Sequence, residues 1–264
     1  MKIIDQLNRE ILLAEKPKRI ISLVPSQTEL LFDLGLENKI VGITKFCVHP
    51  FHAKQTKTVV GGTKNINLEK IIALEPDIIL CNKEENTKEI VESCSEICPV
   101  HVSDIETIND AFELMEHYGK LFSCRTESSK IIQKIKFQLD DFKRFVDDTE
   151  RKKVAYFIWR NPWMVAGNNT FINHLLELNN FENIYGDKEK YPEIEPKKIR
   201  LEGDPDLVFL SSEPYPFKEE HAFELGRFTH HAKTVFVDGE LFSWYGSRLT
   251  KAFDYFKKLH QRII

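Results

Sequence analysis

The most regular hydrophobic pattern in the chain runs from Thr107 to Phe145. Thr107 and Asp110 resemble a helix-capping box, and no proline follows until Pro162. The pattern predicts one helix, which at 1.5 Å per residue would be about 58 Å long. That is more than one small domain needs, so we expect this helix to join two lobes. Apolar residues recur along it at helical spacing, with charges between them: Ile108, Phe112, Met115, Tyr118, Phe122, Ile131, Ile135, Leu139, Phe142 and Phe145.

One stretch of this segment favours an alternative. Gly119, Ser123 and Cys124 interrupt the pattern, and Gly and Ser are residues at which helices bend. Two shorter helices are therefore the competing interpretation.

Before this segment, short β-rich apolar runs are typical of strands buried on both faces of a parallel sheet. Ser26 and Glu29 form a second capping box that predicts a helix ending at Gly35, and Asn67 is expected to cap a helix over 68–74. The turn Pro25–Thr28 would lie at the carboxyl end of a strand, the usual ligand edge of an open α/β sheet. The alternative is that the residues Pro25–Thr28 only cap the helix and bind no ligand. The predicted strands are 19–24, 39–44, 77–81 and 100–102.

After this segment, the sequence patterns that predict strands and helices follow in the same order as before it. Strands are expected over 153–158 and 183–185, with a helix from Asn169 or Thr170 to Leu178 and a last helix from Leu249. Segment 68–80 reappears in outline as 197–209, both reading as helix, Pro-Asp turn and buried strand. We therefore predict an α/β protein with two Rossmann-like lobes of mainly parallel sheet, over 1–106 and 147–264, joined by the single helix 107–146.

Composition narrows the class of protein. A chain of 264 residues with 42% hydrophobic residues can bury a core for two lobes. A net charge of −4 provides no basic field for nucleic acid, and no apolar run is long enough to span a membrane. Five cysteines without framework spacing favour buried thiols over disulfides or a zinc site. Residues 1–20 lack the uninterrupted apolar stretch of a signal peptide, although a removed leader stays open.

Motifs for catalysis are missing from the sequence. It contains no G-x-S-x-G, no G-x-G-x-x-G after a strand, no H-E-x-x-H and no phosphate-binding loop. The loops after the predicted strands carry aromatic and basic residues instead, which suits binding. We expect a protein that is not an enzyme and binds a ligand non-covalently, with an enzyme in the same cleft as the weaker alternative.

Several segments resemble the ABC-transporter substrate-binding proteins of the vitamin B12-binding and ferric-siderophore-binding class. The resemblance covers nearly the whole chain and rests on RIISLVPSQTELLFDLGL (19–36), VGIT (41–44), NLEKIIALEPDIIL (67–80) and DPDLVFLSS (204–212). Shorter marks of a subgroup are RNPWMVAG (160–167), YPE (191–193), SSEPYPF (211–217) and FSWYGSR (242–248). This resemblance implies two lobes bridged by one helix and a ligand held between them, as a monomer without a membrane span.

The resemblance also implies site residues. A proline and aromatics that line the corrin site of B12-binding members fall on Pro25, Phe46, Tyr191 and the region Phe242–Trp244, whereas one family tryptophan falls on Thr63. We expect a cobalt corrinoid or an iron chelate, either haem or a ferric siderophore. It would stack on aromatic residues and pair its anionic groups with basic ones. The predicted contacts are Pro25, Lys45, Phe46, Lys64, Trp159, Arg160, Trp163, Tyr191, Trp244, Tyr245 and Arg248, with His49 as a metal ligand or, alternatively, a loop histidine bonded to backbone.

Members of this class dock on a permease through one exposed glutamate in each lobe. Glu69 matches the first, but the second falls at Lys197, with Glu195 two residues away. The resemblance therefore implies an extracytoplasmic receptor of an ABC importer. A cytoplasmic carrier or sensor of the same ligand is the alternative, favoured by the missing leader, the odd number of thiols and Lys197.

Overall fold

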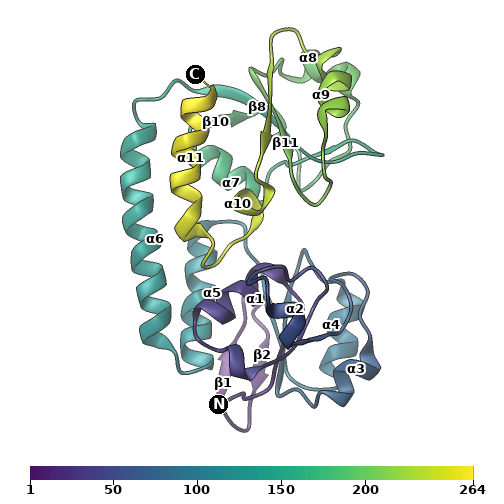
Figure 1. Ribbon diagram of the computed structural model, residues 1–264, viewed down its shortest axis with the longest axis vertical. Coiled ribbons are helices and arrows are strands. Elements are labelled where there is room, and N and C mark those ends of the chain that lie inside the picture. Colours follow the sequence, from purple (N-terminus) through teal and green to yellow (C-terminus); the bar gives the residue numbers. More distant parts are fainter. Residues whose placement is uncertain (264) are drawn as a thin grey trace. The chain divides into compact units, whose positions relative to one another are not determined.

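The computed structural model describes residues 1–263, which form two compact units (Figure 1). Unit 1 contains Met1–Ile105, Asn109–Ile135 and Tyr245–Arg248. Unit 2 contains Glu106–Ile108, Lys136–Trp244 and the C-terminal segment from Leu249. Each unit has its own parallel sheet, so the prediction of two α/β lobes is confirmed. The region 107–146 is divided between the units, with most of its first part in unit 1 and 136–146 in unit 2.

Unit 1 is built on a five-stranded sheet in the order β5-β4-β3-β6-β7, all parallel. The strands are β3 (Ile20–Ser22), β4 (Ile40–Ile43), β5 (Thr58–Val59), β6 (Ile78–Asn82) and β7 (Val100–Ser103). The buried apolar runs therefore form strands where the sequence predicted them. An antiparallel hairpin, β1 (Lys2–Ile4) and β2 (Glu10–Leu12), precedes the sheet.

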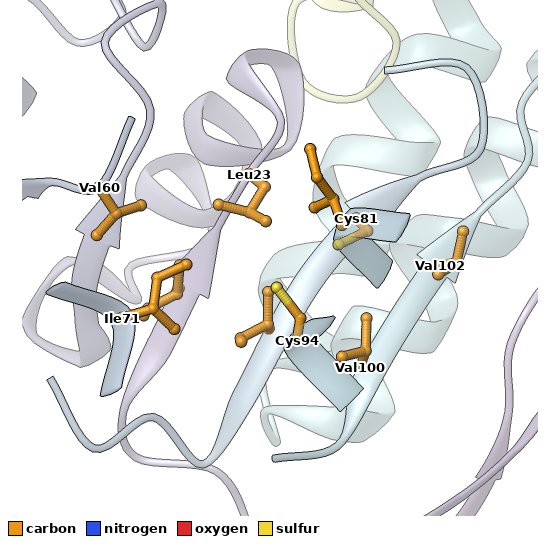
Figure 2. Packing of buried hydrophobic residues seen from close by; sticks show 10 residues of the cluster. Leu23, Val60, Ile71, Cys81, Cys94, Val100 and Val102 are labelled. Carbon is orange, nitrogen blue, oxygen red and sulfur yellow. The ribbon is translucent and has the colours of Figure 1, made fainter. Parts of the chain in front are cut away.

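Side chains alternate between the two faces of this sheet, as the strand period requires. On one face, Val100 and Val102 of β7 pack with Cys81 and with residues of the helices α3 (Leu68–Ala73) and α4 (Lys88–Ser95) (Figure 2). The buried cluster on this face combines aliphatic side chains with the Cys81 and Cys94 thiols. All five cysteines are free, as predicted, and burial raises the pKa of Cys94 to about 11.

The other face of the unit 1 sheet is partly polar. There Gln27 of helix α1 (Pro25–Asp33) donates to Ser103 Oγ at 2.7 Å and accepts from Tyr118 of helix α5 (Ile108–Leu121) at 2.6 Å. The His101 ring lies 5.6 Å from the Tyr118 ring. The remaining helical segments of this unit are the 3₁₀ turn η1 (Glu37–Lys39) and α2 (Ala53–Thr56).

Unit 2 contains a parallel sheet in the order β10-β8-β11-β12, with β9 antiparallel to β8. Its strands are β8 (Lys152–Trp159), β9 (Met164–Val165), β10 (Phe181–Asn183), β11 (Leu207–Ser211) and β12 (Lys233–Val237). Its helical segments are α7 (Phe171–Leu178), η2 (Pro196–Lys198), α8 (Ile199–Glu202), α9 (Glu219–Gly226), α10 (Gly239–Ser243) and α11 (Leu249–Ile263). The helix predicted from Asn169 or Thr170 begins after Thr170, whose hydroxyl accepts from Asn173 N–H.

Aromatic rings fill one face of the unit 2 sheet. Phe242 of α10 lies 5.2 Å from Tyr156 and 4.8 Å from Phe256 of α11, measured between ring centroids. In the part of helix α6 (Arg125–Val146) that belongs to this unit, Phe142 packs on Phe253 and Phe256, and Lys257 of α11 pairs with Asp141. This half of α6 and α11 therefore lie side by side (Figure 1).

The prediction of a single helix from Thr107 to Phe145 is wrong. The segment forms α5 (Ile108–Leu121) and α6 (Arg125–Val146). Ser123 between them adopts φ = 60°, a left-handed conformation that ends a helix. Ser128 then donates to the carbonyl of Met115 at 2.6 Å, and a Cβ on Gly119 would lie 3.0 Å from Ser128 Cβ. The two helices thus pack closely at Gly119, and the chain passes from unit 1 to unit 2 within α6.

The capping box predicted at Ser26 is also wrong. Helix α1 begins at Pro25, after Val24, and no side chain caps it. Proline lacks the N–H that a cap would satisfy and its fixed φ suits the first helical position, so the cap is unnecessary. Gly35 follows the helix at φ = 75°, as predicted.

The internal repeat has a structural counterpart. Asp77, in the turn before β6, accepts from Lys18 and Arg19 N–H at 2.6 and 2.8 Å, just before β3. Asp206, in the turn before β11, accepts from Lys153 N–H at 2.7 Å in β8. In both units the aspartate of the Pro-Asp turn thus binds the start of the neighbouring strand. None of the helices within residues 1–263 has the length and apolar character needed to cross a bilayer.

Candidate functional site

The carboxyl edge of the unit 1 sheet gathers the loops after β3, β4, β5 and β6, because all these strands are parallel. Main-chain and side-chain bonds join these loops. Lys45 N–H donates to the Gly61 carbonyl at 2.7 Å, Asn86 donates to the Thr63 carbonyl at 2.9 Å, and Lys64 Nζ donates to the Glu84 carbonyl. Two of the predicted contact loops, those with Lys45 and Lys64, and the loop after β6 therefore form one bonded surface.

Phe46 is the exposed aromatic residue of this surface. The residue is 49% exposed, and Lys45 Nζ lies 5.0 Å from the centroid of its ring. A Cβ on Gly62 would approach the Phe46 ring to 3.1 Å, so glycine there lets the ring lie against the loop. The result is an aromatic face beside an ammonium group, a combination that suits a planar ligand with anionic substituents.

Two other predicted residues of this edge are less exposed. Pro25 is buried at the start of α1, directly beneath the edge. His49 is half-buried in the loop after β4. Within residues 1–263, the His, Cys, Asp and Glu donor atoms that lie close enough to share a metal ion belong to Asp204, His230 and His231, and His49 is not among them. The role of His49 as a metal ligand stays a prediction.

The corresponding edge of unit 2 presents tryptophan and arginine. Trp159, at the end of β8, is 39% exposed, and its ring lies 5.6 Å from that of Tyr215. Arg160 donates to Glu224 at 2.7 and 3.1 Å, and its guanidinium lies 5.3 Å from the Trp163 ring. Glu224 thus holds the guanidinium over the tryptophan face.

Trp163 is half-buried and belongs to a ring cluster under this surface. It stacks on Phe217 with an interplanar angle of 9° and contacts Phe157 and His221 edge-on. Tyr191 is half-buried and precedes Pro192, whose carbonyl accepts from Val165 N–H. The loop 191–193 therefore lies next to β9.

Trp244 is 7% exposed and donates from Nε1 to Glu213 Oε1 at 2.8 Å. Ser243 donates to the same oxygen at 3.0 Å. Burial raises the pKa of Glu213, with Glu240 and Asp238 acting in the same direction. Trp244 thus helps to satisfy a half-buried carboxyl group, and its contact with a ligand stays a prediction.

Tyr245 and Arg248 belong to unit 1 although they follow α10. The Tyr245 hydroxyl accepts from Gln27 at 3.2 Å, and Arg248 forms a bidentate pair with Glu29 of α1 at 2.7 and 2.9 Å. Both side chains are buried. In this structure they anchor the segment Tyr245–Arg248 to α1. Their contacts with a ligand stay predictions. The single cleft enclosed by both sets of loops also stays a prediction.

Sequence reasoning left two residues out of the predicted site. Tyr215 packs against Trp159, and Glu213 binds Trp244, although neither residue was among the predicted contacts. Both lie in SSEPYPF, directly after β11. Both residues directly follow β11, which is parallel to β8, so their loop leaves the sheet at the same edge as Trp159. This position in the sequence is the signal that could have predicted them.

The predicted docking residues lie on the surface of each unit. Glu69 is exposed in the first turn of α3. Lys197 is exposed in η2, and Glu195 pairs with Lys198 at 2.6 Å.

Comparison with known proteins places this geometry in a family. An uncharacterized ABC transporter substrate-binding lipoprotein of Bacillus subtilis is 25% identical over 256 residues, covering 93% of this chain and 80% of the relative. A vitamin B12-binding protein of Vibrio parahaemolyticus is 22% identical over 199 residues, 75% and 72% of the two chains. The crystal structure of a periplasmic heme-binding protein from Pseudomonas aeruginosa matches with a TM-score of 0.78 at 20% identity, covering 92% of each chain. The model of the periplasmic binding protein family matches residues 20–231, so this chain belongs to that family.

Proposed function

We propose that this protein is the substrate-binding component of an ABC importer and binds a bulky metal chelate without transforming it. The family supports a role in substrate binding. Relatives named for vitamin B12 and heme support the chemical class, a cobalt corrinoid, haem or a ferric siderophore held non-covalently.

The observation that carries this proposal is the same pairing at both carboxyl edges. In unit 1 an ammonium lies beside an exposed phenyl ring, at Lys45 and Phe46. In unit 2 the guanidinium of Arg160, which also bonds Glu224, lies over the half-buried Trp163, and Arg160 directly follows the exposed Trp159 in the chain. Macrocycles and aromatic chelators stack on such rings, and their carboxylate or phosphate groups pair with the neighbouring cations.

The proposal is tested by melting the purified chain with cobalamin, cobinamide, haem and several ferric siderophores. A ligand at 100 times its dissociation constant adds about 2.7 kcal/mol to the free energy of unfolding. An absorbance titration then gives the affinity of each ligand that raises the melting temperature. If none of these chelates raises it, the proposed ligand class is wrong.

A matched pair of variants tests the location. Phe46→Ala should weaken chelate binding about fivefold, because it removes a stacking face worth roughly 1 kcal/mol. Phe137→Ala removes an aromatic residue of α6 that is 73% exposed and is not among the predicted contacts, so it should leave the affinity unchanged. Equal affinities in the two variants would exclude the unit 1 edge as a contact surface.

A further inference from the structure

The opposite, amino edge of the unit 2 sheet carries a second cluster of chemical groups. Strands β11 and β12 are parallel, with Leu207 opposite Lys233. The residues just before them therefore lie side by side. This juxtaposition brings Asp204 and Asp206 of one turn next to His230 and His231 of the other.

The donor atoms of this cluster converge. One donor atom from each of Asp204, His230 and His231 lies within 4.8 Å of the others. His231 Nδ1 is 3.9 Å from Asp204 Oδ2. The other carboxylate oxygen, Asp204 Oδ1, is buried and has no hydrogen-bond partner among residues 1–263. A buried carboxylate oxygen without a partner is costly, and a bound cation would satisfy it.

The backbone holds Asp204 in this position. The residue adopts φ = 46°, and its N–H donates to the Ile199 carbonyl at 3.1 Å. Aspartate is among the few residues that tolerate this left-handed conformation. The turn therefore presents the carboxylate in a fixed place.

Asp206 orients the histidine. Its Oδ1 lies 3.1 Å from His231 Nε2, while its Oδ2 accepts from Lys153 N–H. A proton on Nε2 completes the first of these bonds and leaves the lone pair of Nδ1 toward Asp204. Histidines that bind metals commonly have their other nitrogen bonded to a carboxylate in this way.

We propose that Asp204, His230 and His231 bind a divalent transition-metal ion such as Zn²⁺, with Asp206 as a positioning residue. Two imidazoles and a carboxylate favour zinc over the oxygen-binding ions Mg²⁺ and Ca²⁺. Zinc bonds of about 2.1 Å would bring the donors to roughly 3.4 Å from one another. The exposed His230 ring supplies that adjustment by rotation about its side-chain bonds. Water completes the coordination, and the ion joins the turns that precede β11 and β12.

Calorimetric titration of the full chain with ZnCl₂ tests this site. We expect one ion per chain, a higher melting temperature, and at least tenfold weaker binding in each of His230→Ala, His231→Ala and Asp204→Asn. The matched control is His52→Ala, which removes a half-exposed histidine of unit 1 next to Glu37. This control should bind zinc as the unchanged chain does.

Two outcomes would overturn the proposal: no zinc binding by the unchanged chain, or binding that survives in His230→Ala and His231→Ala. Titration with Co²⁺ in place of Zn²⁺ gives an independent measurement. Co²⁺ bound by nitrogen and oxygen ligands in a site of low coordination number absorbs visible light. That absorption should be lost with His231→Ala. Asp206→Asn should weaken zinc binding between ten- and a hundredfold while keeping one ion per chain, as expected for a residue that acts through His231.

Discussion

Two tryptophans show how the same side chain takes different roles. Trp159 ends β8 and is 39% exposed, with one edge against Tyr215. Trp244 is 7% exposed and bonded to the half-buried Glu213. The first presents a surface for stacking, and the second contributes to the packing of unit 2.

Replacing these residues should separate binding from stability. Trp159→Ala is expected to weaken chelate binding about tenfold and to change the free energy of unfolding by less than about 0.5 kcal/mol. Trp244→Ala is expected to lower that free energy by about 3 to 5 kcal/mol, because it leaves a cavity and removes a donor from Glu213. Urea unfolding and chelate titration measure both quantities. A stability loss in Trp159→Ala equal to that in Trp244→Ala would contradict the assignment.

His101 is the most strongly perturbed histidine of unit 1. It lies in β7, and neither ring nitrogen has a hydrogen-bond partner within residues 1–263. Burial lowers its pKa from 6.5 to about 4, against the opposing effect of Asp5. The folded protein therefore keeps this ring neutral at pH values where the unfolded chain protonates it.

This shift predicts a pH-dependent stability. Between pH 6.5 and about 4 the unfolded chain binds more protons at His101, so the free energy of unfolding falls as the pH is lowered through this window. The loss from this residue is about 3 kcal/mol. Urea unfolding at pH 7 and pH 4.5 measures it. His101→Leu should reduce the pH dependence of the free energy of unfolding. The part contributed by His117 and His260 should remain, because burial also lowers the pKa values of these two residues. An unchanged pH dependence in this variant would exclude His101 as its source.

At the scale of elements, the segment Tyr245–Arg248 is the feature that differs most from a simple two-lobe chain. It lies between α10 and α11 of unit 2 but belongs to unit 1, where Arg248 and Glu29 form a buried pair. Removing one partner of a buried ion pair leaves an uncompensated charge, which is more damaging than removing both.

A double-mutant cycle tests this pair. Arg248→Met should lower the free energy of unfolding by about 3 to 5 kcal/mol, and adding Glu29→Gln should recover part of the loss. The control is Arg144→Met, which removes an exposed partner of Asp141 and should cost less than about 0.5 kcal/mol. Additive losses in the double variant would show that the two side chains stabilise unit 1 independently.

For the whole molecule, the proposed import function requires contact with a permease. Glu69 is the exposed acidic residue of α3 that the family resemblance predicts to dock, whereas in unit 2 the predicted position is occupied by the exposed Lys197. If the permease presents arginines, Glu69 contributes attraction and Lys197 opposes it.

Charge reversal should therefore act in opposite directions at the two positions. Glu69→Lys is expected to weaken the complex with the permease at least tenfold, and Lys197→Glu is expected to strengthen it. Affinity for the detergent-solubilised transporter at two salt concentrations measures both effects, while chelate binding should stay unchanged in each variant. A complex insensitive to both reversals would exclude docking through these residues.

The sequence by itself determined the two α/β units, because apolar runs and Pro-Asp turns are local signals that the chain repeats. It also indicated the loops with Phe46 and Trp159, which follow buried strands. Only the tertiary structure decided the break at Ser123, since the fit of Gly119 against Ser128 depends on two helices meeting. It likewise decided that Arg248 bonds Glu29 and that Asp204 lies beside His231, because such contacts join residues far apart in the chain.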